Sequence, residues 1–147
     1  MSRTAVAAST SLAALMLIGC AGRPELISAD GMLGGCEQPR CVSSQSKDPD
    51  HYIEPIRYEG SREAARAALQ RIVLAMPGSR LALQTEDYLH IEFGAGLLAQ
   101  VDDLELLFPR RQPWVQVRAA SRNAYVDFDD NRQRVEQIRA RFEAVQP

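Results

Sequence analysis

Aromatic residues, histidine and cysteine are scarce in this chain of 147 residues. The sequence has 6% aromatic residues, two histidines and three cysteines, and neither charge is in clear excess, with 17 Lys+Arg against 19 Asp+Glu. The balanced charge gives no general reason to expect a nucleic-acid partner. Long runs of one charge are also absent and 46% of the residues are hydrophobic, so the composition is that of a single globular domain and not of a disordered chain.

A long hydrophobic run is lacking as well. The apolar stretch over residues 5–18 is interrupted by Ser9, Thr10 and Ser11, and it is shorter than the about 20 residues that a membrane-spanning helix needs. Arg3 precedes this stretch and small residues follow it, which is the layout of a secretory signal. We therefore predict a signal peptide over residues 1–19.

The residues that end this segment resemble a bacterial lipobox: Leu17-Ile18-Gly19-Cys20. The resemblance implies that Cys20 is acylated and becomes the first residue of the mature chain, which makes the membrane a partner through the lipid anchor. Ala21, where similar lipoproteins retained in the inner membrane carry Asp, implies the outer membrane, facing the periplasm. An ordinary signal peptide and a weak membrane helix are the alternatives.

Lipidation of Cys20 leaves two further cysteines, Cys36 and Cys41. The oxidising cell envelope favours a disulfide between them. Their C-x₄-C spacing is neither that of a zinc ribbon nor that of a thioredoxin-like site, although free thiols and a metal or redox role remain alternatives. Residues 20–35 contain proline and glycines without a sustained period, and we interpret them as the lipidated tether of a domain over residues 36–147.

The spacing of apolar residues in the domain predicts an α+β fold. A helix starts after Ser61 and ends before Pro77-Gly78, and a second helix starts at Asp129-Asp130. Strand-like alternation occurs over residues 51–58, 80–85, 88–93, 101–108 and 114–118. The predicted order is β-α-β-β-β-β-α, in an antiparallel sheet of four to five strands with both helices on one face.

Several segments together resemble the DUF1499 family, a bacterial and plastid domain of unknown function. The matching stretches include Cys36…Cys41-Val42-Ser43-Ser44-Gln45, Asp50-His51-Tyr52-Ile53-Glu54-Pro55, Val101-Asp102-Asp103-Leu104-Glu105, Arg118-Ala119-Ala120-Ser121-Arg122 and Asn131-Arg132-Gln133-Arg134-Val135-Glu136. Their order and spacing agree over residues 36–143. The resemblance implies one α+β domain and no established activity, so it leaves the function open.

Cationic and polar residues gather around a predicted strand end and the start of the last helix. Helix N-termini and arginine forks both bind anions. We therefore predict a site for an anionic ligand formed by Arg118, Ser121, Arg122, Asn131 and Arg132, with Ser43 and Ser44 nearby through the bridged loop. The alternative is structural: Arg118 and Arg122 pair with Asp102, Asp103 or Asp127 and fasten the last helix to the sheet.

Residues for general acid–base chemistry are not evident. Asp103 and Glu105 share one face of a predicted strand and Asp102 lies on the other, which favours a solvated or salt-bridged face. His51 and His90 have unrelated spacing, so we predict no metal and no cofactor.

The serines give no further support for catalysis, since Ser43, Ser44 and Ser121 lie in neither a G-x-S-x-G nor an S-x-x-K context. The sequence therefore favours a non-catalytic binding or envelope-assembly module whose partner is an anionic small molecule, a glycan or an envelope protein.

Two other classes of function stay open. A small envelope hydrolase or transferase would use Ser43 or Ser44 with His51 or His90, and it requires a histidine within about 3 Å of a serine. A purely structural adaptor would saturate Arg122 and Arg132 with acidic partners and leave no pocket.

Overall fold

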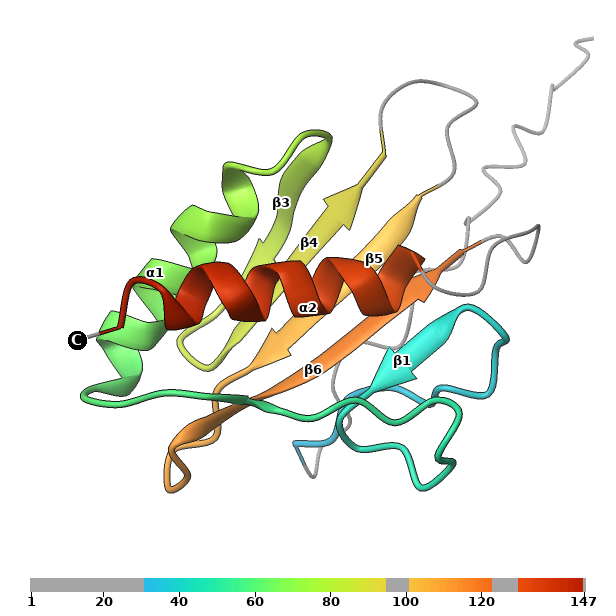
Figure 1. Ribbon diagram of the computed structural model, residues 1–147, viewed down its shortest axis with the longest axis horizontal. Coiled ribbons are helices and arrows are strands. Elements are labelled where there is room, and N and C mark those ends of the chain that lie inside the picture. The colour runs from blue at the N-terminus through green and yellow to red at the C-terminus, as the bar shows by residue number, and fades with distance from the viewer. Residues whose placement is uncertain (1–30, 95–100, 123–129, 147) are drawn as a thin grey trace, which may run out of the picture.

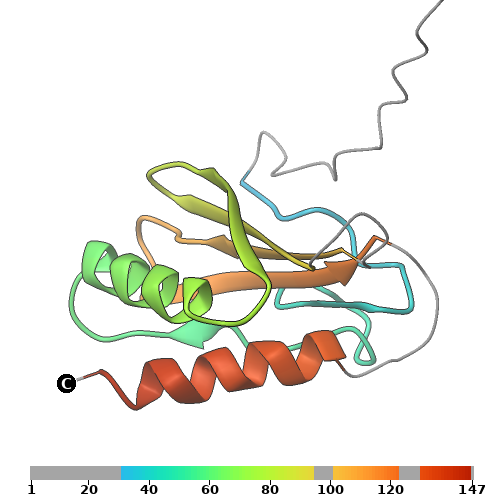
Figure 2. The same ribbon diagram turned by 90° about the horizontal axis from the view of Figure 1, so that it is seen from above.

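The computed structural model describes residues 31–94, 101–122 and 130–146. The elements in chain order are β1 (Cys41–Ser43), β2 (Ile56–Arg57), α1 (Arg62–Leu74), β3 (Ser79–Gln84), β4 (Tyr88–Phe93), β5 (Asp102–Leu107), β6 (Trp114–Ser121) and α2 (Asp130–Glu143). The strands pair antiparallel in the order β1-β6-β5-β4-β3, and β2 pairs with the start of β6. Both helices lie on the same face of this sheet (Figures 1 and 2), which confirms the predicted α+β class.

Helix α1 begins and ends where local sequence signals place its boundaries. The Ser61 side chain accepts a hydrogen bond from the Ala64 backbone N–H at 3.1 Å, as expected of an N-cap. The helix ends at Leu74, just before Pro77-Gly78, where Gly78 has a positive φ of 75°.

The alternation of apolar residues along the strands produces a core between the sheet and the helices. The side chains of this core are almost fully buried, and their fixed alternation means that a shift of one residue in strand register would expose them. They include Leu89, Ile91, Leu104, Leu106, Val115 and Val117 from the sheet and Leu69, Val73, Val135, Ile138 and Phe142 from the helices.

The first strand differs from the prediction. The sequence around Cys36–Pro49 is rich in serine, proline and aspartate and predicts a loop, whereas residues 41–43 form β1 and pair with β6, with Cys41 opposite Ala120 and Ser43 opposite Arg118. Three residues are too few to show the alternation typical of a strand. The strand is stabilised instead by its pairing with β6. The predicted strand over residues 51–58 contracts to β2, directly after Pro55, which has no backbone N–H to donate.

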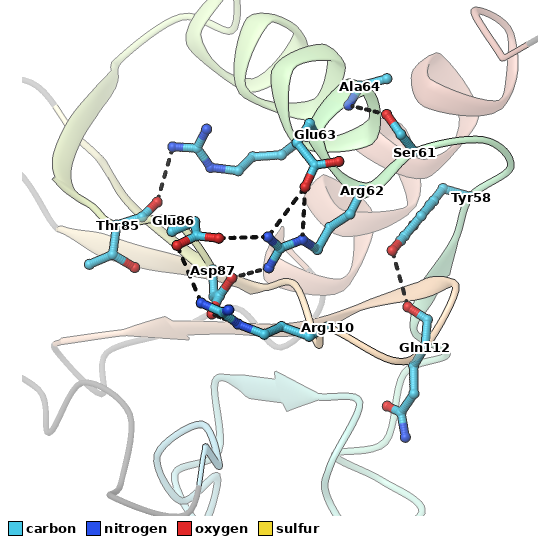
Figure 3. Close-up of polar contacts among 11 residues, drawn as sticks. Tyr58, Ser61, Arg62, Glu63, Ala64, Thr85, Glu86, Asp87, Arg110 and Gln112 are labelled. Atoms are coloured by element: carbon cyan, nitrogen blue, oxygen red, sulfur yellow. Dashed lines mark hydrogen bonds and ion pairs between the residues drawn. The ribbon is translucent and has the colours of Figure 1, made fainter.

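A group of ion pairs at the start of α1 holds the helix to two connections of the sheet (Figure 3). Arg62 contacts Glu63, Glu86 and Asp87, and Arg110 contacts Glu86 at 3.3 Å and Asp87 at 3.0 Å. We call these five residues the α1 clasp. Burial by itself would raise the pKa of Asp87, but the hydrogen bonds from Arg110 and Arg62 outweigh it and hold that pKa below its ordinary value.

Among the described residues, no helix is long and apolar enough to cross a bilayer. The predicted signal peptide, the lipidation site Cys20 and the first part of the tether lie outside the described residues, as does Asp127. The structure does place residues 32–35, which the sequence assigns to the tether. There Leu33 is buried and packs with Tyr88 and Leu107 on the face of the sheet opposite the helices.

Candidate functional site

The seven residues of the predicted anion site are divided between the two faces of the sheet. Because side chains alternate along β6, Arg118 and Arg122 lie on the helix-free face, whereas Ser121 lies on the helix face beside Asn131. Ser43 is the cross-strand neighbour of Arg118. The structure therefore does not form one pocket from these residues.

On the helix face, Ser121 and Asn131 belong to a cluster that fastens α2 to the sheet. The Asp102 carboxylate accepts hydrogen bonds from Ser121 Oγ at 2.6 Å and from Arg134 Nη2 at 2.8 Å. Asn131 Nδ2 donates to Ser121 Oγ at 3.0 Å and to the Arg40 carbonyl at 2.9 Å. The structural alternative is therefore the better description of this cluster, with Arg134 as the arginine that joins the helix to β5.

On the helix-free face, the carboxylate of Glu105 is completely buried. It accepts hydrogen bonds from Tyr88 Oη at 2.8 Å and from Arg118 Nη1 at 2.5 Å. Arg118 Nε donates in addition to the Gly35 carbonyl at 2.9 Å. Burial, and then the negative charge of Glu105, raise the pKa of Tyr88 far above its ordinary value, so this hydroxyl remains a donor.

A second set of ion pairs lies next to it on the same face. Asp103 accepts hydrogen bonds from His90 Nε2 at 2.7 Å and from Arg122 Nε at 2.9 Å, while Arg122 Nη2 also reaches Glu92 at 2.6 Å. Burial by itself would raise the pKa of Asp103, but the hydrogen bonds from His90 and Arg122 outweigh it and lower that pKa. Together with Tyr88, Glu105 and Arg118, these residues form what we call the sheet-face network.

The donor atoms of His90, Glu92 and Asp103 lie within 4.8 Å of one another, close enough to hold a metal ion. However, the Arg122 guanidinium already bridges the two carboxylates and supplies the positive charge that an ion would bring. We therefore assign these residues to an ion-pair network. The cysteines cannot join the histidines as metal ligands, because Cys36 and Cys41 form the predicted disulfide, with an S–S distance of 2.01 Å.

The remaining members of the predicted site bind protein groups. Ser44 Oγ donates to Gln116 Oε1 at 2.6 Å and accepts from the Val117 N–H at 2.8 Å, which extends the pairing of β1 with β6. Ser43 Oγ accepts a hydrogen bond from the Gln45 N–H at 3.2 Å. The two terminal nitrogens of Arg132 donate to the carbonyls of Tyr52 and Asp50, both at 2.8 Å.

The serine–histidine pair needed for a hydrolase does not form within the ranges that the structure describes. His51 Nδ1 donates to the Cys41 carbonyl at 2.8 Å, and His90 is held by Asp103. In those ranges no serine hydroxyl is bonded to either imidazole.

A cavity of about 510 Å³ lies between residues 32–37, which we call the strap, and the loop that follows β1. The strap is held by the disulfide, by the bond from Arg118 to Gly35, and by a bond from the Leu33 N–H to Gln45 Oε1 at 2.8 Å. We call this space the strap cavity. The residues that line it include Met32, Leu33, Glu37, Ser43, Gln45, Ser46, Lys47, Asp48 and His51.

Two charges in the strap cavity differ from those of the predicted site. Lys47 and Glu37 form no ion pair or hydrogen bond with residues 31–94, 101–122 or 130–146. Glu37 and His51 also line a neighbouring cavity of about 460 Å³, in which Arg132 takes part. Glu37 and Lys47 give no signal in the sequence, because one lysine and one glutamate in irregular segments form no motif, whereas Ser43 and Arg132 belong to the predicted anion site.

Comparison with known proteins identifies the family of the chain. Residues 34–142 match the family described as "Protein of unknown function (DUF1499)", which confirms the resemblance seen over residues 36–143. No curated protein and no solved structure matches the chain. The chain belongs to the DUF1499 family.

Proposed function

We propose that this protein is a lipid-anchored binding module of the bacterial cell envelope, attached through Cys20 to the outer membrane and facing the periplasm. In this proposal, the strap cavity takes up a polar small molecule or a segment of an envelope protein. The twelve peptide units from Cys20 to Met32 span at most about 40 Å, so the anchor would hold the cavity close to the membrane surface.

The strap cavity is the feature that carries this proposal. Its volume lies in the range of small-molecule sites, and it contains both apolar side chains and polar groups without protein partners in the described residues. The arginines of the predicted anion site, in contrast, already bind acids or carbonyls. A ligand that replaced those partners would have to compensate for the buried carboxylates that it leaves unpaired.

The two other classes of function receive less support. A hydrolase lacks its serine–histidine contact in the described part of the chain. A structural adaptor agrees with Arg122, which pairs with Asp103 and Glu92, but not with Arg132, whose partners are carbonyls. It also predicts that no pocket exists, and the strap cavity favours a binding role.

Hydrogen exchange tests the binding proposal directly. The full chain carrying Cys20→Ser is mixed with the small-molecule fraction of a bacterial cell envelope, and amide exchange is compared with that of the free chain. We expect slower exchange in residues 32–37 and 43–51 and no change in the α1 clasp. Unchanged exchange at the strap cavity, or protection confined to another surface, would show that the cavity is not the binding site.

The anchor has its own test. Cell fractionation of the wild-type chain should place it in the membrane fraction, and Cys20→Ser should move it to the soluble fraction and remove the acyl mass. A Cys20→Ser chain that is still acylated and membrane-bound would contradict the anchor.

A further inference from the structure

Lys47 is the only lysine among the 147 residues, and the other 16 basic residues are arginines. Arginine suits bidentate ion pairs, and Arg118, Arg122 and Arg134 are used in this way or in close hydrogen bonds to acids. A lysine is instead a compact point charge on a flexible stem. The one lysine lines the strap cavity and has no ion pair with the described residues.

Glu37 presents the opposite charge to the same cavity from the other wall. Glu37 belongs to the strap, whereas Lys47 belongs to the loop after β1. The Glu37 carboxylate folds back over Gly35, so closely that a Cβ atom built on that glycine would lie 2.5 Å from Glu37 Oε2. The two charges do not pair with each other. Both side chains are exposed, and Asp48, which lines the same cavity beside Lys47, accepts a hydrogen bond from the Asp50 N–H at 3.0 Å. An unpaired ammonium on one wall and an unpaired carboxylate on the other are complementary to a ligand that carries both charges.

Other residues that line the cavity can contact the uncharged part of such a ligand. Gln45 uses its carbonyl oxygen to accept from Leu33, which leaves its two amide N–H donors for an acceptor. Ser43 Oγ accepts from Gln45 and can still donate its own proton. Leu33 and Met32 provide apolar contact beside these polar groups.

From this arrangement we propose that the strap cavity binds a zwitterionic ligand of the amino-acid or short-peptide class. Lys47 binds its carboxylate, and Glu37 binds its ammonium. This inference rests on the proposed function, since it names the ligand class of the same cavity.

The single lysine allows a specific test. Reductive methylation with ¹³C-formaldehyde labels Lys47 and the chain terminus while keeping the positive charge, so the Lys47 methyl signal reports on the cavity. The full chain carrying Cys20→Ser is titrated with three probes: alanyl-alanine, its N-acetylated form without the ammonium, and its C-terminal amide without the carboxylate. We expect alanyl-alanine to shift the signal and to bind about tenfold more tightly than either blocked form.

Two variants, measured by calorimetry on unlabelled chains, assign the two charges separately. Glu37→Gln should bind alanyl-alanine no more tightly than the N-acetylated form, but still more tightly than the C-terminal amide. Lys47→Met should do the reverse: it should lose the preference over the amide and keep the preference over the N-acetylated form. Arg110→Ala, in the α1 clasp, is the control and should keep both preferences.

Equal affinity for the three probes, or no binding of any of them, would overturn the proposal that the cavity binds a zwitterionic ligand. The envelope-fraction experiment separates this failure from failure of the proposed function. If that fraction still protects the strap cavity from exchange, the cavity binds a ligand of another class; if it does not, both proposals are wrong.

Discussion

The α1 clasp and the sheet-face network are made of the same groups, arginines with aspartates and glutamates, but they lie in different surroundings. In the clasp, the side chains of Arg110 and Glu86 are 65% and 67% exposed. In the network, those of Arg118 and Glu105 are 6% and 0% exposed. An exposed pair is screened by water and contributes little to stability, whereas a buried charge that loses its partner is strongly destabilising.

The comparison shows why arginine content alone is a poor guide to a binding site. Arg118 and Arg122 stand out in the sequence as an anion-binding pair, yet Glu105, Asp103 and Glu92 neutralise them. Of the charged side chains that line the strap cavity, the less conspicuous Lys47 and Glu37 have no protein partner within the described residues. Burial and pairing therefore separate residues that hold the fold together from residues that are free to bind.

The largest effect is expected from Arg118→Ala. It leaves the fully buried Glu105 carboxylate without its cation, and we expect the free energy of unfolding to fall by about 3–5 kcal/mol in urea denaturation. Replacing both charges, with Glu105→Leu and Arg118→Met, should recover at least half of that loss because no unpaired ion is left. A loss below about 1 kcal/mol for Arg118→Ala would mean that burial does not distinguish the network from the clasp.

A smaller loss is expected when the disulfide is removed. Cys36→Ser with Cys41→Ser opens a short loop, and the chain-entropy estimate for such a loop is about 2 kcal/mol. The same variant should speed amide exchange in the strap and leave exchange in the α1 clasp unchanged. Equal acceleration in both regions would show that the disulfide stabilises the whole fold without selectively holding the strap.

Acid should weaken the network more than the clasp. The pKa of Asp103 is lowered in the folded chain, so its stabilising contribution is complete above the unfolded value of about 3.9 and is lost as the pH falls through the lower folded value. The pKa of Asp87 is lowered too, but this side chain is partly exposed. Asp103→Asn should therefore reduce the pH dependence of the free energy of unfolding between pH 5 and pH 2 more than Asp87→Asn does. The opposite order would contradict the comparison.

The smallest effect is expected in the clasp itself. Arg110→Ala should change the free energy of unfolding by less than about 1 kcal/mol, and added salt should reduce that difference, because Arg110 and Glu86 are both largely exposed. A thermal melt at low and high salt measures both quantities. A loss as large as that of Arg118→Ala would show that exposed pairs here are not screened.

Much of the fold follows from local pattern. The alternation in β4 and β5 correctly separates Leu89, Ile91, Leu104 and Leu106 from the polar side chains of the other face. That pattern does not reveal that the other face is buried as well, since its cover comes from the strap. Strap residue Leu33 and strand β1 are too short to show a period, and tertiary contacts, among them those with Tyr88, Leu107 and β6, stabilise them.

Partner choice was the least predictable part of the site. The i,i+4 spacing predicts pairs of Arg132 with Glu136 and of Arg139 with Glu143. In the structure Arg132 donates to the carbonyls of the segment before β2, and Arg139 does so as well while pairing with Glu136 at 2.9 Å. Carbonyls that lie against α2 need donors, and this demand arises only once the tertiary fold has formed.

Native mass spectrometry of the full chain carrying Cys20→Ser tests most directly whether the strap cavity, and not the arginine cluster, binds the ligand. The exported chain is purified from the soluble fraction of the periplasm beside its Lys47→Ala and Arg122→Ala variants, and each spectrum is repeated under denaturing conditions. We predict a noncovalent adduct on the chain with Lys47 intact, retained by folded Arg122→Ala and lost by folded Lys47→Ala. An adduct retained by Lys47→Ala and lost by folded Arg122→Ala would contradict this account.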